Sequence, residues 1–244
     1  MPSHLENNPS GQPGLVSPGP VLALTGASLS AVGLIGFGRS GHAIYSDQSA
    51  GHVEGLIPLA DAVLARAGAV PGDLAAVAVG RGPAPYTGLR IALATAQALG
   101  SALGLPVWGV SDLDVLVADA VQRFGLTAGV TLVSALDAKR REVYWARYRV
   151  DQPAKVDGLT RLEGPAVSLP AAVPGADLVV GPGSERYAEV MGPAVGGPQV
   201  VDPVILAHLA VRRASLGQDV STRPLYLRRP DVRVPDLKRR VSGQ

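Results

Sequence analysis

The sequence predicts an α/β protein built from two successive lobes. Short apolar runs alternate with longer segments of helical periodicity, Gly and Pro punctuate them, and the order of the first half begins again in the second. Of the 244 residues, 47% are hydrophobic and 17% charged, so the chain is long and apolar enough to bury a large core. This composition excludes a disordered protein.

The first lobe is expected over residues 21–110. Strands are predicted at 21–25, 31–37 and 42–46, followed by a helix at 52–67 whose apolar residues recur every three or four positions. A strand at 74–79, a Gly/Pro-rich loop, a helix at 88–104 and a strand at 106–110 come next. The uncharged stretch 91–110 contains Gln97, Ser101 and Pro106, which indicates a buried helix and a strand rather than a membrane span.

The second lobe is expected over residues 111–222. Ser111 and Asp114 resemble a capping box for a helix that runs to residue 124. Two strands, at 130–135 and 142–150, flank a turn at 137–141, and weak strand signals follow in a Pro/Gly-rich stretch. After a strand at 177–180 and a short helix from 183, Asp202 and Pro203 supply an N-cap and an N1 proline for a helix to about residue 216.

The two ends of the chain differ from the lobes in composition. Residues 1–20 contain five Pro, three Gly and no Lys or Arg, so we expect a disordered leader rather than a secretory signal, and a cytoplasmic protein. Residues 223–244 are expected to form a basic tail. The absence of Cys excludes disulfides, thiolate catalysis and thiolate metal sites.

The loop at 80–88 is a candidate anion site because backbone N–H groups at Gly82, Thr87 and Gly88 precede a helix. The loop matches neither the Walker nor the dinucleotide pattern. The favoured interpretation is a rigid turn in which Thr87 caps the helix.

The helix at 88–104 is apolar nearly all round, with Arg90 as its one charge. Such a helix is either enclosed within the fold or covered by a partner, and both interpretations stay open. No two of the four His are spaced as ligands on one helix face, and the sequence has no Gly-x-Ser-x-Gly elbow. We therefore expect no metal site and no catalytic residue in this chain.

Charge is concentrated in two segments, although the net charge is only +2. Residues 139–149 contain five basic residues and one acidic residue, and residues 223–240 contain seven and two. Such segments suit RNA phosphates, and Arg228, Arg229 and Arg233 are candidate RNA contacts. A solvated strand and a solubilising tail explain the same charges equally well.

Four segments follow one another along the chain: HVEGLIP at 52–58, the run from 78 to 113 with AVGRGPAPYTGLRIALATAQALG, ALDAKRREVY at 135–144 and YLRRPD at 226–231. Together they resemble the TsaB (YeaZ) family of tRNA threonylcarbamoyladenosine biosynthesis. The resemblance covers nearly all of residues 21–231.

This resemblance implies the two-lobed fold of actin, sugar kinases and Hsp70, with a βββαβα core in each lobe. It implies a non-catalytic subunit that dimerises with the TsaD catalytic paralogue and is joined by the TsaE ATPase, with tRNA bound through the complex. The resemblance implies no cofactor in this chain, and it places ATP and a metal ion in the partner subunits. Without its partner, the chain could form a homodimer. The implied partner interface consists of His52, Glu54, Leu56, Leu59, Val63, Arg90, Ala94, Gln97, Ala98 and Ser101.

Two departures bear on the alternative functions. The first strand leads into Thr25-Gly26-Ala27-Ser28, without the carboxylate of the usual Asp-Thr-Ser loop, which argues against an ATP-dependent small-molecule kinase of the same fold. Ala84-Pro85-Tyr86 replaces the common Gly-Ser-Phe and stiffens the loop. A peptidase is not supported, because no metal pair or nucleophile motif is present.

Overall fold

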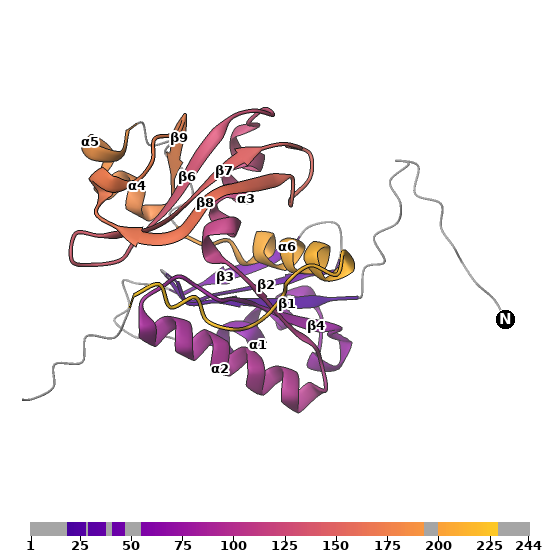
Figure 1. The fold of residues 1–244 in the computed structure, drawn as a ribbon. Coiled ribbons are helices and arrows are strands. Elements are labelled where there is room, and N and C mark those ends of the chain that lie inside the picture. Colours follow the sequence, from indigo (N-terminus) through magenta and orange to yellow (C-terminus); the bar gives the residue numbers. More distant parts are fainter. Residues whose placement is uncertain (1–18, 28, 38–40, 47–54, 193–199, 229–244) are drawn as a thin grey trace, which may run out of the picture.

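The computed structural model describes residues 19–27, 29–37, 41–46, 55–192 and 200–228. They form two lobes, each built on one sheet (Figure 1). The sheets are joined by helices that cross between them. Within the described residues, no helix is long and apolar enough to span a membrane.

The first sheet has the order β3-β2-β1-β4-β5. Its strands are β1 (Val21–Thr25), β2 (Ala31–Ile35), β3 (His42–Tyr45), β4 (Ala76–Gly80) and β5 (Val107–Val110). The β1–β2–β3 pairs are antiparallel, whereas β4 pairs in parallel with both β1 and β5. The central strands β1 and β4 consist mainly of Val, Leu and Ala and are buried on both faces, as is typical of parallel strands.

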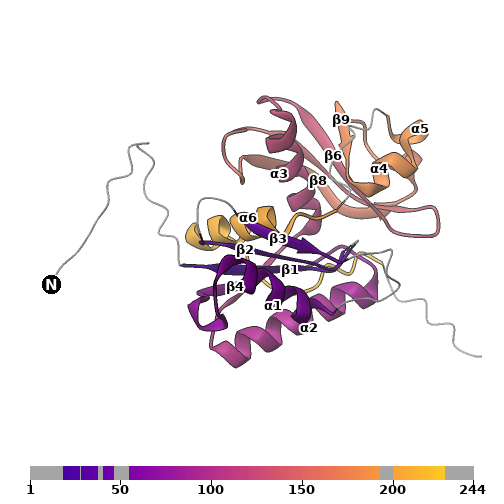
Figure 2. The same cartoon turned by 180° about the vertical axis from the view of Figure 1, so that it is seen from behind.

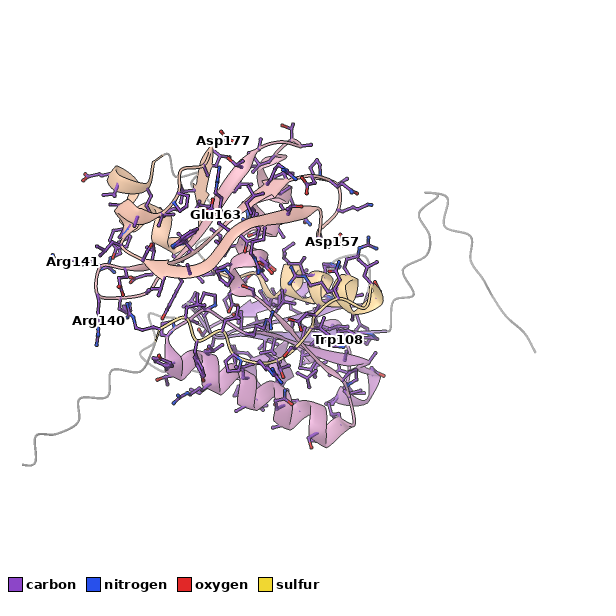
Figure 3. All side chains as sticks on the ribbon, viewed as in Figure 1. Trp108, Arg140, Arg141, Asp157, Glu163 and Asp177 are labelled. Carbon is purple, nitrogen blue, oxygen red and sulfur yellow. The ribbon has the colours of Figure 1, made fainter. Side chains whose placement is uncertain are left out.

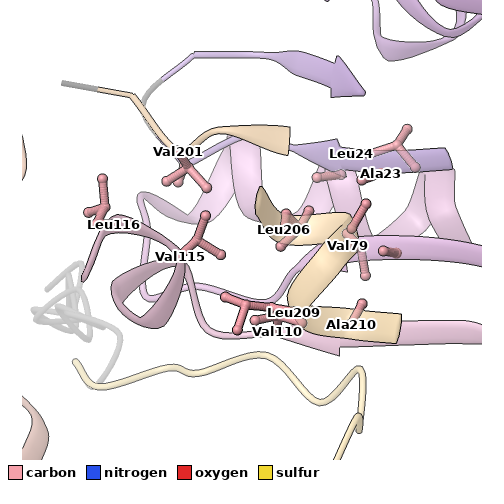
Figure 4. Packing of buried hydrophobic residues seen from close by; sticks show 14 of the residues in the cluster. Ala23, Leu24, Val79, Val110, Val115, Leu116, Val201, Leu206, Leu209 and Ala210 are labelled. Carbon is pink, nitrogen blue, oxygen red and sulfur yellow. The ribbon is translucent and has the colours of Figure 1, made fainter. Parts of the chain in front are cut away.

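Helices cover both faces of the first sheet. On one face lie α1 (Leu56–Ala67) and α2 (Tyr86–Leu103) (Figure 2). Between these two helices the chain forms the short 3-10 turn Pro71–Asp73 and then β4. The opposite face is covered by α6 (Pro203–Ser215), which contacts β1, β2, β4 and β5. Figure 4 shows Leu206 of α6 beside Val79 of β4, and Leu209 of α6 beside Val110 of β5.

The second sheet has the order β8-β7-β6-β9, which matches β3-β2-β1-β4 of the first. Its strands are β6 (Thr131–Asp137), β7 (Val143–Val150), β8 (Leu159–Ser168) and β9 (Leu178–Val180). Where the first lobe has α1, this lobe has only the 3-10 turn Pro170–Ala172, and β9 leads into the short helices α4 (Pro182–Arg186) and α5 (Ala188–Met191). The two-lobed α/β prediction is confirmed.

The helix that follows each sheet in the chain packs on the other sheet. α3 (Asp112–Phe124) follows β5 of the first sheet but packs on β6, β7 and β9, while α6 follows the second lobe and packs on the first sheet. The segment after α6 also returns to the first lobe, where Gly109 N–H donates to Val220 O at 2.8 Å. The range 111–222 expected for the second lobe thus contains a helix and a segment that pack on the first.

Three local predictions differ from the structure. α2 begins at Tyr86 with Pro85 at its N-cap, so Thr87 does not cap it. α1 begins at Leu56, and the expected start at 52–54 lies outside the described residues. Ser111 stands at the N-cap of α3 without a side-chain cap bond, because Asp114 is held by distant partners instead of closing a capping box.

Candidate functional site

A buried carboxyl group occupies the point where the parallel strands β1, β4 and β5 end. Asp112, at the start of α3, is 1% exposed. Its Oδ2 accepts the backbone N–H of Gly82 at 2.7 Å, and its Oδ1 accepts the hydroxyl of Thr25 at 3.4 Å. Burial raises the pKa of Asp112 to about 7, although the bonds from Gly82 and Thr25 oppose this rise and Asp114 adds to it.

The loop proposed as an anion site is packed around this carboxyl group. The N–H of Gly82 is directed at Asp112 and is therefore not available to a ligand. A Cβ on Gly88 would lie 2.3 Å from the carbonyl oxygen of Gly26, so the first turn of α2 is in contact with the end of β1. The chain's own carboxyl group takes the position in which Gly82 could have held an anion.

A cleft of about 310 Å³ lies between the lobes. It is lined by Ala27, Pro83, Ala84, Pro85, Leu136, Asp137, Lys139, Pro182 and Arg186. Asp137 is held there by two cations, with Lys139 Nζ at 3.3 Å and Arg186 Nη1 at 3.0 Å from its Oδ2. The carboxylate of Asp137 is thus engaged in ion pairs, and the cleft offers mostly apolar walls with charge at one side.

The outer face of α2 is an exposed crest of small and apolar residues. Its members are Ile91, Ala94, Ala98, Ser101 and Ala102, and the opposite face of the helix packs in the core. A shallow apolar groove of about 430 Å³ runs beside this α2 crest, between α1 and α2, and Ile57, Ala94, Thr95, Ala98, Leu99 and Ala102 line it. Ile57 and Ile91 are 46% and 48% exposed, and the contiguity of exposed apolar residues over the crest and the groove is typical of an interaction surface.

The C-terminal segment of residues 216–228 lies along the other side of α2. Gln97 Nε2 donates to Thr222 Oγ1 at 2.8 Å, and Arg90 Nε donates to the hydroxyl of Tyr226 at 3.2 Å. Arg90 also lies 5.4 Å from the ring centroid of Tyr86 and 5.7 Å from that of Tyr226, as a cation–π contact. The α2 crest is therefore flanked by α1 on one side and by this C-terminal segment on the other.

Comparisons with known proteins agree on the relationship of this chain. Residues 44–215 match the TsaD family model, described as tRNA N6-adenosine threonylcarbamoyltransferase. The solved structure of YeaZ from Pseudomonas aeruginosa is 30% identical with a TM-score of 0.71, over 86% of this chain and all of that one. Another P. aeruginosa structure, described as an uncharacterized protein with similarity to peptidase YeaZ, is 32% identical with a TM-score of 0.73 over the same shares.

The chain belongs to the TsaB/YeaZ family. The tRNA threonylcarbamoyladenosine biosynthesis protein TsaB of Escherichia coli is 37% identical over 101 residues, which are 41% of this chain and 42% of that protein. An uncharacterized protein of Mycobacterium tuberculosis is 44% identical over 185 residues, covering 75% of this chain and 77% of the relative.

The partner interface implied by the TsaB resemblance falls into separate groups in the structure. Ala94, Ala98 and Ser101 lie on the α2 crest, whereas Leu56, Leu59 and Val63 are buried beneath α1 in the core. Arg90 and Gln97 are turned toward the C-terminal segment. His52 and Glu54 lie outside the described residues.

The sequence reasoning missed two large residues of this surface and one small one. Ile57 is one of the apolar residues that recur along the helix predicted at 52–67, but it faces the groove, and Ile91 and Ala102 are exposed on the α2 crest. A helical wheel centred on the buried residues of α2 would have placed Ile91 and Ala102 opposite the core. Because α2 is apolar nearly all round, its hydrophobic pattern does not separate the exposed residues from the buried ones.

The candidate tRNA contacts also fall in different environments. Arg228 is held within the molecule: it donates to the carbonyl of Ala138 at 2.8 Å and pairs with Glu142, and its side chain is 17% exposed. Its own carbonyl accepts the hydroxyl of Tyr86 at 2.7 Å. Arg229 and Arg233 lie outside the described residues.

A second buried carboxylate joins the two lobes. Asp114 accepts Tyr148 OH at 2.5 Å and Arg161 Nη2 at 2.6 Å on Oδ1, and Arg213 Nη2 at 2.8 Å on Oδ2. Burial alone would raise the pKa of Asp114, but Arg213 and Arg161 outweigh it and lower the pKa. Asp114 is therefore charged and tied to β7, β8 and α6.

Among the described residues, no group of three or more Asp, Glu or His side chains is arranged to hold a metal ion.

Proposed function

We propose that this chain is a non-catalytic subunit in tRNA threonylcarbamoyladenosine biosynthesis, which pairs with a TsaD-like transferase. Family membership supports the process, since the E. coli relative carries that name and the matching family model is that of the transferase. The observation that carries the pairing is the α2 crest with its apolar groove. Small side chains on the crest allow a helix of a partner to approach closely.

The kinase alternative has no support. The E. coli and Haemophilus influenzae relatives are TsaB proteins, one solved neighbour is YeaZ, and the matching family model is TsaD. At the end of β1, Thr25 donates its hydroxyl to Asp112, so this position contributes to internal packing in place of a ligand-facing carboxylate. A TsaE-like ATPase as third component, ATP and a metal ion in those partner chains, and a cytoplasmic location remain parts of the proposal.

Introducing a charge on the α2 crest tests the pairing. In a strain that co-expresses the TsaD-like chain of the same organism, Ala94→Glu or Ala98→Glu should abolish co-purification, because burying an unpaired carboxylate costs on the order of 3 kcal/mol, about 100-fold in Kd. Glu is a good helix former, so α2 itself should stay folded. Ala154→Glu is the matched control, since Ala154 is exposed in a turn of the second lobe.

If both crest variants co-purify with the TsaD-like chain as the wild type does, the α2 crest is not the interface. Sedimentation of the isolated wild-type chain and of Ala98→Glu tests the homodimer separately. A dimer that Ala98→Glu converts to a monomer would indicate that the same crest pairs two copies when the partner is missing.

A further inference from the structure

The turn between β6 and β7 presents three consecutive cations on a strained backbone. Lys139, Arg140 and Arg141 have φ values of 61°, 55° and 63°, in the left-handed region that side chains rarely adopt. Elsewhere in the described residues the chain uses glycine at positive φ, as at Gly68 and Gly104 after α1 and α2. Glycine would relieve the strain in this turn as well. What the three residues supply in its place is positive charge.

The neighbouring residues hold this turn from both sides. Asp137, before the turn, pairs with Lys139 and Arg186, and Glu142, after it, pairs with Arg228. The acidic groups that flank the turn are thus already engaged by cations. Lys139 and Arg186 nevertheless keep 69% and 60% of their side-chain surface exposed, so they can still meet a ligand.

The turn is also where the two basic segments of the sequence meet. Arg228 belongs to the second basic segment, and its guanidinium bonds the carbonyl of Ala138 in the turn of the first. The described part of the chain ends at Arg228, and residues 229–244 add five Lys or Arg and two Asp in sequence. Figure 3 shows Arg140 and Arg141 at one end of the second lobe, directed away from the body of the molecule.

We propose that this cationic turn, formed by Lys139, Arg140 and Arg141 with Arg186 beside it, docks the sugar-phosphate backbone of RNA. Guanidinium groups match phosphate oxygens in bidentate geometry, and weak hydration favours their transfer into such contacts. Residues 138–142 contain no aromatic side chain on which a base could stack, and the ring of Tyr187, beside Arg186, is partly buried and faces the Arg186 guanidinium at 5.8 Å. The turn therefore reads backbone charge and not base sequence. The inference rests on the proposed function, which makes tRNA the RNA concerned.

Salt-dependent binding of labelled, unmodified tRNA to the full chain tests the docking. Arg140→Gln/Arg141→Gln should bind at least about 10-fold more weakly at ~0.1 M KCl, with a slope of log affinity against log salt that is smaller by about 0.7–0.9 for each lost contact. The matched control, Arg66→Gln/Lys155→Gln, removes the same charge from exposed positions on α1 and in the 151–158 turn. It should bind within about 2-fold of the wild type.

A charge-preserving variant guards against a folding effect. Arg140→Lys/Arg141→Lys should keep the salt slope, because the charge is kept, and should bind more tightly than Arg140→Gln/Arg141→Gln but more weakly than the wild type, because Lys lacks the bidentate geometry. All variants should unfold at the wild-type temperature. Equal losses in the two Gln double variants would show that only total charge matters and would overturn the proposal. Unchanged tRNA binding by Arg140→Gln/Arg141→Gln would also overturn it. If that variant instead loses binding to vesicles of anionic lipid, the turn docks a membrane surface and not RNA.

The same variants separate this inference from the proposed function. Arg140→Gln/Arg141→Gln should co-purify with the TsaD-like chain as the wild type does, because the cationic turn lies on the second lobe and the α2 crest on the first. If the wild-type chain fails to pair with the TsaD-like chain, the proposed function fails, while the tRNA measurement remains interpretable.

Discussion

Gly26 and Gly88 meet backbone to backbone. A Cβ built on Gly88 would lie 2.3 Å from the carbonyl oxygen of Gly26, and one on Gly26 would lie 2.6 Å from the carbonyl oxygen of Gly88. This contact joins the end of β1 to the first turn of α2. It therefore sets the position of the helix whose outer face is the α2 crest, and it leaves no space for a side chain on either residue.

Replacing Gly88 with Ala should consequently destabilise the fold. Because the obstructing atoms belong to the backbone, the strands and helix must separate, and we expect a loss of about 2 kcal/mol, or roughly 4–8 °C in Tm. Thermal unfolding followed by circular dichroism measures the change. Gly72→Ala is the control, since nothing lies within 4 Å of a Cβ at that exposed position. A variant Gly88→Ala as stable as Gly72→Ala would contradict the close approach.

The buried carboxyl of Asp112 should make stability depend on pH near neutrality. Its pKa in the folded state, about 7, is above the ordinary value of 3.8, so the folded protein binds a proton that the unfolded chain releases. The stabilisation from this proton is complete below about pH 4 and is lost as the pH rises to about 7, by up to about 1.4 kcal/mol per pH unit.

Urea unfolding of the wild type and of Asp112→Asn at several pH values between about 4 and 8 isolates that contribution. Asn can still accept the N–H of Gly82 but cannot ionise. As the pH rises, the unfolding free energy of the wild type should therefore fall relative to that of Asp112→Asn, and the difference should level off above pH 7. A difference that is constant over this range would show that Asp112 titrates normally.

Local signals in the sequence predict local structure well in this chain. The Asp202-Pro203 pair opens α6 as expected, with Asp202 Oδ1 accepting the N–H groups of Val204 at 2.7 Å and Ile205 at 3.2 Å. The succession of strands and helices along the first lobe follows equally from apolar runs and turns. In these cases the determining residues are neighbours in the chain.

Predictions failed where distant partners decide the outcome. Asp114 has the spacing of a capping box, but Tyr148, Arg161 and Arg213 draw it into the interior, and none of them is near in sequence. α6 follows the second lobe in sequence and packs on the first sheet, where Pro203 lies against Gly33. Neither the ion pairs nor this exchange of helices leaves a periodic signal in a single sequence.

The ion pairs of Asp114 should be strongly coupled to stability. Arg213→Ala leaves a buried carboxylate with one cation fewer, and we expect a loss of about 3 kcal/mol. Arg147→Ala removes the exposed pair with Glu163, 2.9 Å apart, and should cost no more than about 1 kcal/mol. In the Arg213→Ala background, Asp114→Asn should recover part of the loss, and a double-mutant cycle measures the coupling. Additive effects of the two changes would contradict direct pairing.

Arg228 should order the cationic turn without determining global stability. Its guanidinium donates to Ala138 O and pairs with Glu142, so Arg228→Ala removes both contacts and leaves the strained backbone less restrained. Amide hydrogens at residues 138–142 should then exchange faster, which mass spectrometry of the exchanged protein detects. Arg223→Ala is the control, because Arg223 is exposed in the same C-terminal segment. Unchanged exchange in the turn of Arg228→Ala, or the same acceleration in Arg223→Ala, would show that the turn keeps its conformation independently of Arg228. In that case the two basic segments are neighbours without being coupled, and tRNA binding at the turn should not change when Arg228 is replaced.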